Sequence, residues 1–430
     1  MEELAIFGGK PVRESKMVGP YPGGSVYGAE EAEAVCEVIR RKSPFRYYGE
    51  NVQGTVRNFE DMVSKYFDIP YVHACSSGTA AVVLSLIGIG VEPGDRIVVP
   101  ANTFYATTSA SIFAGGIPVY CDVDHSMNIN PDALEKILAE GGVKAVIVVP
   151  ILGNPCAMER IAAMCKRYGV YLIEDAAQAM GSRFHGALTG TFGDVSTFSL
   201  QINKIITAGE GGLVLTRNPV IYERVVRFHD QGMFRDARRH PELKDQEPIC
   251  MIGINFRMSE VAGALACAQM RKIDYIVGHM HDIKYRVKAA IQPELEAMGV
   301  EFRTVLDTEG DASNSLIMYM PTAEKAREFI RALSAENIHC DALYNGKPIY
   351  AAPSLMNKAT PYRCGYPFNL EKEPVVYRPG MCPVAEDILS RNVILQMAAG
   401  YSDSDADDII HGVLKVARVI LAKEEKKHVG

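Results

Sequence analysis

Residues 199–212 read Ser-Leu-Gln-Ile-Asn-Lys-Ile-Ile-Thr-Ala-Gly-Glu-Gly-Gly, and the rest of the chain is organised around them. This stretch joins two short β-like runs, residues 195–198 and 213–216, and places one lysine, Lys204, on the connecting loop. An unpaired ammonium is costly to bury, so a lysine between buried strands needs a reason. It can supply an amine for Schiff-base chemistry, or it can be a surface lysine beside a glycine turn. The loop alone leaves both interpretations open.

The composition excludes several classes of protein. A chain of 430 residues can bury a large core and should divide into two domains. The net charge of −7 argues against a general binder of nucleic acid or anionic membranes. The acidic start lacks the layout of a secretion signal, and the longest apolar stretch, residues 145–152, is too short to span a bilayer. We therefore predict a cytoplasmic protein with reduced cysteines and, because its histidines and cysteines are scattered, no metal site.

The order of the predicted elements indicates an α/β fold. Between residues 70 and 216, strand-like runs alternate with helical patterns, which predicts a mostly parallel, doubly wound sheet. Residues 1–28 are rich in glycine and proline and are expected to form an arm that packs on another body, such as a partner subunit. Beyond residue 296 we expect a smaller α+β domain, with strands at 300–305, 315–320 and 340–344 and helices at 323–337, 385–398 and 404–421. This predicts an arm (1–28), a large domain (29–275) and a small C-terminal domain (276–430).

Three strand ends carry candidate site residues. Ser77, Gly78 and Thr79 follow the strand at 71–74 and open a helix, where free backbone N–H groups could hold a phosphate or the hydroxyls could simply cap the helix. Phe104 follows the strand at 96–99 and could stack on a planar ring or belong to the core. Asp175 ends an apolar strand, so it needs a cationic partner. That cation could be a pyridinium nitrogen or a structural arginine or lysine.

Two further stretches could contact a substrate. Phe45-Arg46-Tyr47-Tyr48-Gly49 could line a pocket mouth or form a surface turn with aromatic plugs. The polar stretch 230–248 is predicted to be a long loop, and such loops in compact domains are often functional or mobile. Its basic residues could meet an acidic substrate or be solvated charge; they are Arg235, Arg238, Arg239 and His240.

Four segments together resemble the DegT/DnrJ/EryC1/StrS aminotransferases, from about residue 29 to the end of the chain. They are Ser76-Ser77-Gly78-Thr79-Ala80, Glu174-Asp175-Ala176-Ala177-Gln178, the segment from Ser199 to Gly212 with Lys204, and Gly253-Ile254-Asn255-Phe256-Arg257. The resemblance implies a fold-type-I transferase dependent on pyridoxal 5'-phosphate, with a mostly parallel seven-stranded sheet between helices. It implies transfer of an amino group from glutamate or glutamine to a keto- or aldehydo-sugar, sugar acid or cyclitol.

The resemblance also implies roles for individual residues. Lys204 would hold the cofactor covalently and later shuttle a proton, while Asp175 would pair with the pyridine nitrogen. Gln178 would lie near the 3-hydroxyl and Phe104 would stack on the ring. The phosphate would be held by Ser77, Gly78, Thr79 and Ser199, and by Asn255 from the other subunit. A homodimer with shared active sites is therefore expected.

Departures from the family pattern bear on the substrate. Pro150 and Gln231 stand where many members have histidine, whereas Lys204 is kept where family dehydratases have histidine, which favours transamination. Residues 45–47, 252–260 and 309–311 look most like the branch that makes 8-amino-3,8-dideoxy-manno-octulosonate. A substrate of that kind carries a carboxylate, which Arg46, with Tyr47 beside it, or Arg235 could receive. The alternatives are a dehydratase or epimerase on the same scaffold, or a non-catalytic regulator that binds the cofactor.

Overall fold

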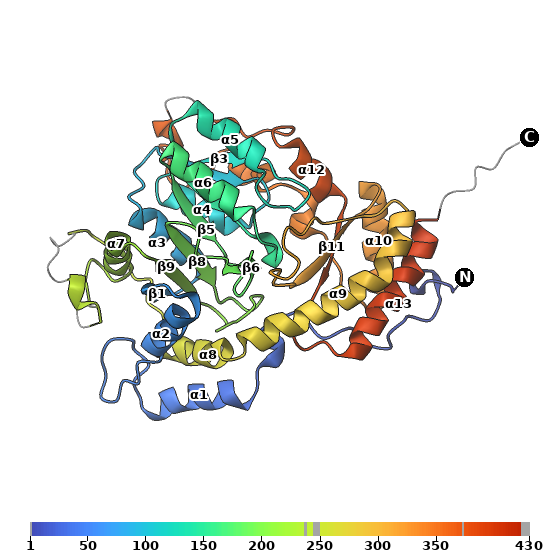
Figure 1. The fold of residues 1–430 in the computed structure, drawn as a ribbon, viewed down its shortest axis with the longest axis horizontal. Coiled ribbons are helices and arrows are strands. Elements are labelled where there is room, and N and C mark those ends of the chain that lie inside the picture. Colours follow the sequence, from blue (N-terminus) through green and yellow to red (C-terminus); the bar gives the residue numbers. More distant parts are fainter. Residues whose placement is uncertain (1, 236–238, 244–249, 372–373, 423–430) are drawn as a thin grey trace, which may run out of the picture.

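A seven-stranded sheet forms the centre of the computed structural model, which describes residues 2–235, 239–243, 250–371 and 374–422 (Figure 1). In spatial order its strands are β1 (Tyr71–Cys75), β9 (Gly212–Thr216), β8 (Val195–Ser199), β5 (Tyr171–Asp175), β4 (Val143–Val148), β2 (Arg96–Pro100) and β3 (Ile117–Cys121). β9 pairs antiparallel with β1 and β8, whereas the other neighbouring strands are parallel. The predicted mostly parallel sheet is confirmed.

Helices cover both faces of the sheet because alternate strand residues point to opposite sides. On β2, Ile97 and Val99 belong to one buried cluster with α3 (Gly78–Gly88) and α7 (Pro219–His229). Val98, between them, belongs to another cluster with α5 (Pro131–Glu140) and α6 (Met158–Tyr168). The other helices of this unit are α1 (Ala29–Arg40), α2 (Thr55–Phe67), α4 (Tyr105–Phe113) and α8 (Glu260–Met270).

The C-terminal unit is built on a second, antiparallel sheet. Its strands are β10 (Glu301–Phe302), β11 (Ser315–Tyr319) and β12 (Asn392–Gln396). Helices α9 (Ile273–Ala297), α10 (Ala323–Ala335) and α13 (Asp403–Ile420) pack beside it in one hydrophobic cluster. In Figure 1 the long helix α9 runs from α8 of the larger unit to α13 of the smaller one.

Two predicted elements of this unit are wrong. Residues 385–398 do not form one helix: α12 (Pro383–Ser390) ends and β12 follows it. Residues 340–344 do not form a strand, because Asp341 makes only an isolated bridge to Ile394 before the 3-10 turn η5 (Leu343–Gly346). The remaining short elements are η1 (Ala5–Phe7), η2 (Gly24–Val26), η3 (Ile151–Gly153), η4 (Pro241–Leu243), η6 (Ile349–Ala351), η7 (Phe368–Leu370), α11 (Pro353–Met356), β6 (Arg183–Phe184) and β7 (Ala187–Leu188).

The N-terminal arm packs on its own chain. Leu4 is buried, and the backbone N–H groups of Ala5 and Val12 both donate to the carboxylate of Glu336 at 2.9 Å. Arg13 forms an ion pair of 2.8 Å with Asp405 at the start of α13. The arm is thus attached to the C-terminal unit of the same chain, and its packing on a partner subunit stays a prediction.

All ten cysteines are free thiols, as predicted. Within the described part of the chain, no helix is long and apolar enough to cross a membrane. The charged tail after Leu421 lies almost wholly outside the described residues.

Candidate active site

A cavity of about 520 Å³ lies beside the ends of β5 and β8, and residues of the C-terminal unit close its other side. This volume is in the range typical of small-molecule sites. The structure brings eight of the predicted site residues to its lining, from four separate segments of the chain. They are Ser77, Gly78, Thr79, Phe104, Asp175, Gln178, Ser199 and Lys204.

Asp175 is a buried carboxylate held by neutral donors. The hydroxyl of Thr107 donates to its Oδ2 at 2.7 Å and the N–H of Ala177 to its Oδ1 at 3.3 Å. Burial raises the pKa of Asp175 above its usual value, and the hydrogen bond from Thr107 opposes this. Among the described residues no arginine, lysine or histidine forms an ion pair with it, so the structural salt bridge considered from the sequence is absent. A carboxylate in this state is ready to pair with a cation in the cavity.

Lys204 lies on the tight loop that joins β8 to β9. Its backbone N–H donates to Gln201 O at 2.9 Å, and the loop is closed by the bond from Ala208 N to Leu200 O at 2.9 Å. Burial lowers the pKa of the Lys204 amine, while the charges of Asp175 and Glu210 oppose the shift. A lowered pKa leaves more of the amine unprotonated near neutral pH, which is the form that attacks a carbonyl.

The start of α3 forms a cradle for an anion. Ser77 caps this helix, since its Oγ accepts from Ala80 N at 3.1 Å, so the capping role considered for Ser77 is present. A Cβ at Gly78 would lie 2.7 Å from the Cβ of Ser199, so only glycine leaves the space between these segments open. Free N–H groups at a helix start together with two hydroxyl residues suit a phosphate.

The C-terminal unit supplies a wall of the cavity that the sequence did not reveal. Tyr344, Asn314 and Gln396 line it. The amide of Gln178 joins this wall to the larger unit, because its Nε2 donates to Tyr344 Oη at 3.2 Å and its Oε1 accepts from Leu152 N at 3.0 Å. The Nδ2 of Asn314 donates to Gln178 O at 3.1 Å. A tyrosine at the end of a predicted strand gave no signal of this role.

The charges of the cavity are few. Among the described residues that line it, the charged side chains are Asp175, Lys204 and Glu210. The C-terminal wall itself presents amides and a phenol. Burial raises the pKa of Tyr344, so its hydroxyl keeps its proton.

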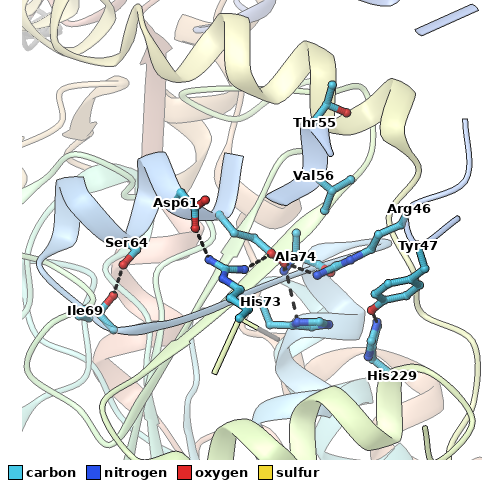
Figure 2. Close-up of polar contacts among 12 residues, drawn as sticks. Arg46, Tyr47, Thr55, Val56, Asp61, Ser64, Ile69, His73, Ala74 and His229 are labelled. Atoms are coloured by element: carbon cyan, nitrogen blue, oxygen red, sulfur yellow. Dashed lines mark hydrogen bonds and ion pairs between the residues drawn. The ribbon is translucent and has the colours of Figure 1, made fainter. Parts of the chain in front are cut away.

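The three predicted substrate residues lie together, outside the lining of this cavity. Arg46 is buried, forms an ion pair of 2.6 Å with Glu60 and donates to Ala74 O at 2.8 Å. Tyr47 Oη lies 3.0 Å from His229 Nε2, and Figure 2 shows the two rings meeting there. Arg235 lies over the ring of Tyr47 at 5.2 Å and forms an ion pair of 2.6 Å with Asp230.

The other basic residues of the long loop are also placed outside the cavity lining. Arg239 pairs with Glu60 and with Asp61, the latter at 2.7 Å, and His240 is buried. Arg238 lies outside the described residues.

Asn255 lies on an exposed segment and does not line this cavity. Its Oδ1 accepts from Arg257 N at 3.1 Å. The neighbouring Ile252 is 92% exposed. A second, open hollow of about 350 Å³ lies between Arg257, α8 and Glu210, and Glu210 also lines the first cavity.

These features fit pyridoxal phosphate, the group implied by the resemblance. The cradle at Gly78 and Ser199 suits its phosphate, and the buried Asp175 suits a protonated ring nitrogen. Phe104, which is 55% exposed at the cavity, can cover an aromatic ring. Among the described residues, no group of three or more histidine, cysteine, aspartate or glutamate side chains could hold a metal ion.

Comparisons with known proteins show which chains this one is similar to. The DegT/DnrJ/EryC1/StrS aminotransferase family matches residues 27–414. A GDP-perosamine synthase of Escherichia coli O157:H7 is 32% identical over 252 residues, covering 57% of this chain and 66% of that protein. The matched regions of three such synthases cover only 56–66% of their length.

Another relative matches almost end to end. The L-glutamine:2-deoxy-scyllo-inosose aminotransferase of Streptomyces lividus is 29% identical over 435 residues, covering 97% of this chain and 98% of that protein. Among solved structures, an E. coli GDP-4-keto-6-deoxy-D-mannose-3-dehydratase with bound hydrated pyridoxal phosphate has a TM-score of 0.77 at 19% identity. It covers 92% of this chain and 100% of its own. That likeness supports the fold, which is α/β with helices on both faces of the sheet.

Proposed function

Because the chain belongs to the DegT/DnrJ/EryC1/StrS aminotransferase family, we propose that it is a pyridoxal-phosphate-dependent aminotransferase. The observation that carries the proposal is the cavity in which Lys204 lies with Asp175, a buried carboxylate bonded only by neutral donors. Asp175 has no ion-pair partner among the described residues, and the charge of Lys204 only partly offsets the effect of its burial, so a protonated pyridine ring would provide the partner. When bound, the cofactor would supply the electron sink for transamination.

Each side chain of the site has its own proposed role. Lys204 would hold the cofactor through Nζ, and its free amine would carry a proton at that atom. Asp175, fixed by Thr107, keeps the ring nitrogen protonated. Ser77, Gly78, Thr79 and Ser199 bind the phosphate. Phe104 would cover the ring, and Gln178 holds Tyr344 at the cavity by donating to its hydroxyl.

We propose an uncharged, polyhydroxylated ketone, such as a keto-cyclitol or a simple keto-sugar, as the amino acceptor. We call the wall that the C-terminal unit supplies, with Tyr344, Asn314 and Gln396, the acceptor wall. These side chains hydrogen-bond hydroxyl groups but offer no charge to a carboxylate or diphosphate. The end-to-end match to a cyclitol aminotransferase supports the same class, whereas the GDP-perosamine synthases match only in part. A sugar acid such as an octulosonate is disfavoured because Arg46 is held by Glu60. For the amino donor we propose glutamine or glutamate.

The proposed working unit is a homodimer in the cytoplasm. The exposed Ile252 and the open hollow beside Arg257 support an interface at this edge, where Asn255 would reach the phosphate in the partner's cavity. Tyr47 and Arg235 belong to the same edge, and we propose Arg235 for the carboxylate of the amino donor across the interface. The side chain of Arg235 is 31% exposed.

The test is covalent trapping followed by the donor half-reaction. The protein loaded with pyridoxal phosphate and reduced with borohydride should carry the pyridoxyl group on the peptide containing Lys204. Unreduced protein should lose its absorbance band when glutamine or glutamate is added, and Lys204→Ala should show neither effect. An unchanged spectrum with both donors would identify a non-catalytic binder. Product formed from a keto-sugar without incorporation of label from [α-¹⁵N]glutamine would identify a dehydratase or epimerase.

A further inference from the structure

The N-terminal arm reaches the back of the loop that carries Lys204. The N–H of Gly23 donates to the backbone carbonyl of Lys204 itself at 3.2 Å. Four residues further on, Tyr27 Oη donates to Thr207 O at 3.0 Å. The arm therefore contacts the middle of the lysine loop at two points three residues apart.

Gly23 is required here by space rather than by backbone conformation. Its φ of −75° and ψ of −35° are open to any residue. A Cβ at this position would lie 2.6 Å from Ile205 O and 2.5 Å from the Oε1 of Gln269, a fully buried side chain. Since a backbone carbonyl cannot rotate away, a methyl group at residue 23 would push the lysine loop.

The same segment is attached to the C-terminal unit. Ser25 Oγ accepts from Gly400 N at 2.9 Å, and a Cβ at Gly400 would lie 2.9 Å from the Cβ of Ser25. Gly400 follows β12, which ends at Gln396 in the acceptor wall of the cavity. Residues 21–27 thus lie between the loop that holds the reactive amine and the strand that brings in the opposite wall.

We propose that residues 21–27 act as a strap that sets the position of Lys204 relative to the acceptor wall, with Gly23 as the positioning residue. Gly23 lies just before the residues that match the family model, 27–414. The proposal uses the proposed function only in taking Lys204 as the reacting amine. Because displacement of a reacting group by about 1 Å can cost 10²-fold in rate, even a small push on this loop should be measurable.

The experiment compares Gly23→Ala with Gly28→Ala on the same arm, where a Cβ would meet nothing within 4 Å. The first readout needs no cofactor: the rate at which acetic anhydride labels Lys204, followed by peptide mass mapping against pH. In Gly23→Ala the midpoint of this profile should move by about half a pH unit or more, since the surroundings that hold the amine have shifted. Gly28→Ala should match the wild type. This readout keeps failure of the strap distinct from failure of the proposed function.

The second readout is steady-state kinetics of the loaded enzyme. Gly23→Ala should lower kcat by about tenfold or more while the KM for scyllo-inosose, the acceptor probe, stays within about twofold. Gly400→Ala, which presses on Ser25 from the C-terminal unit, should shift the labelling of Lys204 in the same direction. A lower melting temperature with unchanged labelling and unchanged kcat would overturn the proposal.

If Gly23→Ala does not fold, Tyr27→Phe tests whether the strap positions Lys204. This variant keeps the ring and loses only the hydrogen bond to Thr207 O. It should move the labelling profile and kcat in the same direction by a smaller amount. Wild-type values for both would overturn the proposal.

Discussion

The hydroxyl of Thr107 donates to Asp175 Oδ2 at 2.7 Å, so a side chain of α4 fixes the carboxylate at the end of β5. Thr107 Oγ1 also lies 2.7 Å from Thr103 Oγ1, and since its own proton goes to Asp175, it accepts from Thr103. Both threonines are buried. The two hydroxyls therefore form a short relay that ends on the carboxylate.

Thr107→Val should weaken catalysis through Asp175. Burial already raises the pKa of this carboxyl, and the hydrogen bond from Thr107 lowers it, so removing the hydroxyl should raise the pKa further. We expect kcat to fall by about tenfold and the acid limb of the pH–kcat profile to move to higher pH. Thr107→Ser keeps the donor and should restore both values. An acid limb that stays in place in Thr107→Val would contradict this account.

Tyr344→Phe should affect the acceptor and not the donor. The Tyr344 hydroxyl accepts from Gln178 at 3.2 Å, which leaves its own proton for a substrate hydroxyl. Losing one such bond should raise the KM for an uncharged keto-cyclitol by about three- to tenfold. The rate of the glutamine half-reaction, measured by stopped-flow absorbance, should stay at the wild-type value.

Tyr362→Phe is the matched control for this change, because Tyr362 is 54% exposed and does not line the cavity. It should leave the acceptor KM unchanged. A loss of the donor half-reaction in Tyr344→Phe would show that the hydroxyl serves the cofactor instead.

The sequence was sufficient to bring together those candidate site residues that lie at the ends of regular strands. Asp175 and Lys204 could be brought together in advance because short strand-like runs in an alternating α/β pattern identify β5 and β8, and the ends of adjacent parallel strands share one edge. The same reasoning placed Ser77 and Phe104 at that edge. Each of these predictions needed only local pattern and topology.

The acceptor wall could not be predicted, because tertiary contacts set its conformation. Tyr344 has a left-handed φ of 50°, which a tyrosine adopts only when its surroundings hold it there. The run Asn392–Gln396 is apolar and only five residues long, so its pattern does not separate a strand from a helix. Pairing with β11 decides for a strand.

The burial of the charged side chain of Arg46 was the other feature that the sequence did not predict. Arg46 stands among aromatic residues on a loop, a setting that suggests an exposed contact residue. Its partner, Glu60, lies on α2, and its second acceptor is the carbonyl of Ala74 on β1. Nothing local in the sequence connects these three positions.

Glu174 should make the stability of the fold depend on pH. It is fully buried, and burial raises its pKa to about 7 although its carboxylate accepts three backbone N–H groups at 2.7 Å. The folded protein therefore holds this proton more tightly than the unfolded chain, whose ordinary value is 4.5. The contribution of Glu174 to the free energy of unfolding is fully present below that value and is lost as pH rises to about 7, by on the order of 3 kcal/mol.

Urea denaturation of wild type and Glu174→Gln from pH 4.5 to pH 8, roughly the window just argued, checks this. The glutamine does not titrate, so the advantage of the wild type should shrink as pH rises and level off above about pH 7. A constant difference between Glu174→Gln and the wild type across this range would mean that its carboxyl does not titrate in this window.

Asp311→Ala should strongly lower the free energy of unfolding, although Asp311 does not line the cavity. Asp311 is buried, pairs with the equally buried Lys284 and accepts from Ser313 N at 3.0 Å. Removing the carboxylate leaves the ammonium without its counter-ion, which typically costs about 3–5 kcal/mol in the free energy of unfolding. Asp407→Ala breaks an ion pair with Arg286 in which the aspartate is 65% exposed, and it should cost less than about 1 kcal/mol.

Asp311→Ala should also weaken binding of the acceptor, because the segment that Asp311 anchors continues directly into Asn314 of the acceptor wall. We expect Asp311→Ala to raise the acceptor KM several-fold while the glutamine half-reaction keeps its rate. Lys284→Met combined with Asp311→Ala removes the unpaired charge and should recover more than half of the lost stability, measured by urea denaturation. It should not recover the acceptor KM, since the anchor is still missing. If the double variant were no more stable than Asp311→Ala, the loss would come from the bonds to Ser313 and its neighbours rather than from the stranded ammonium.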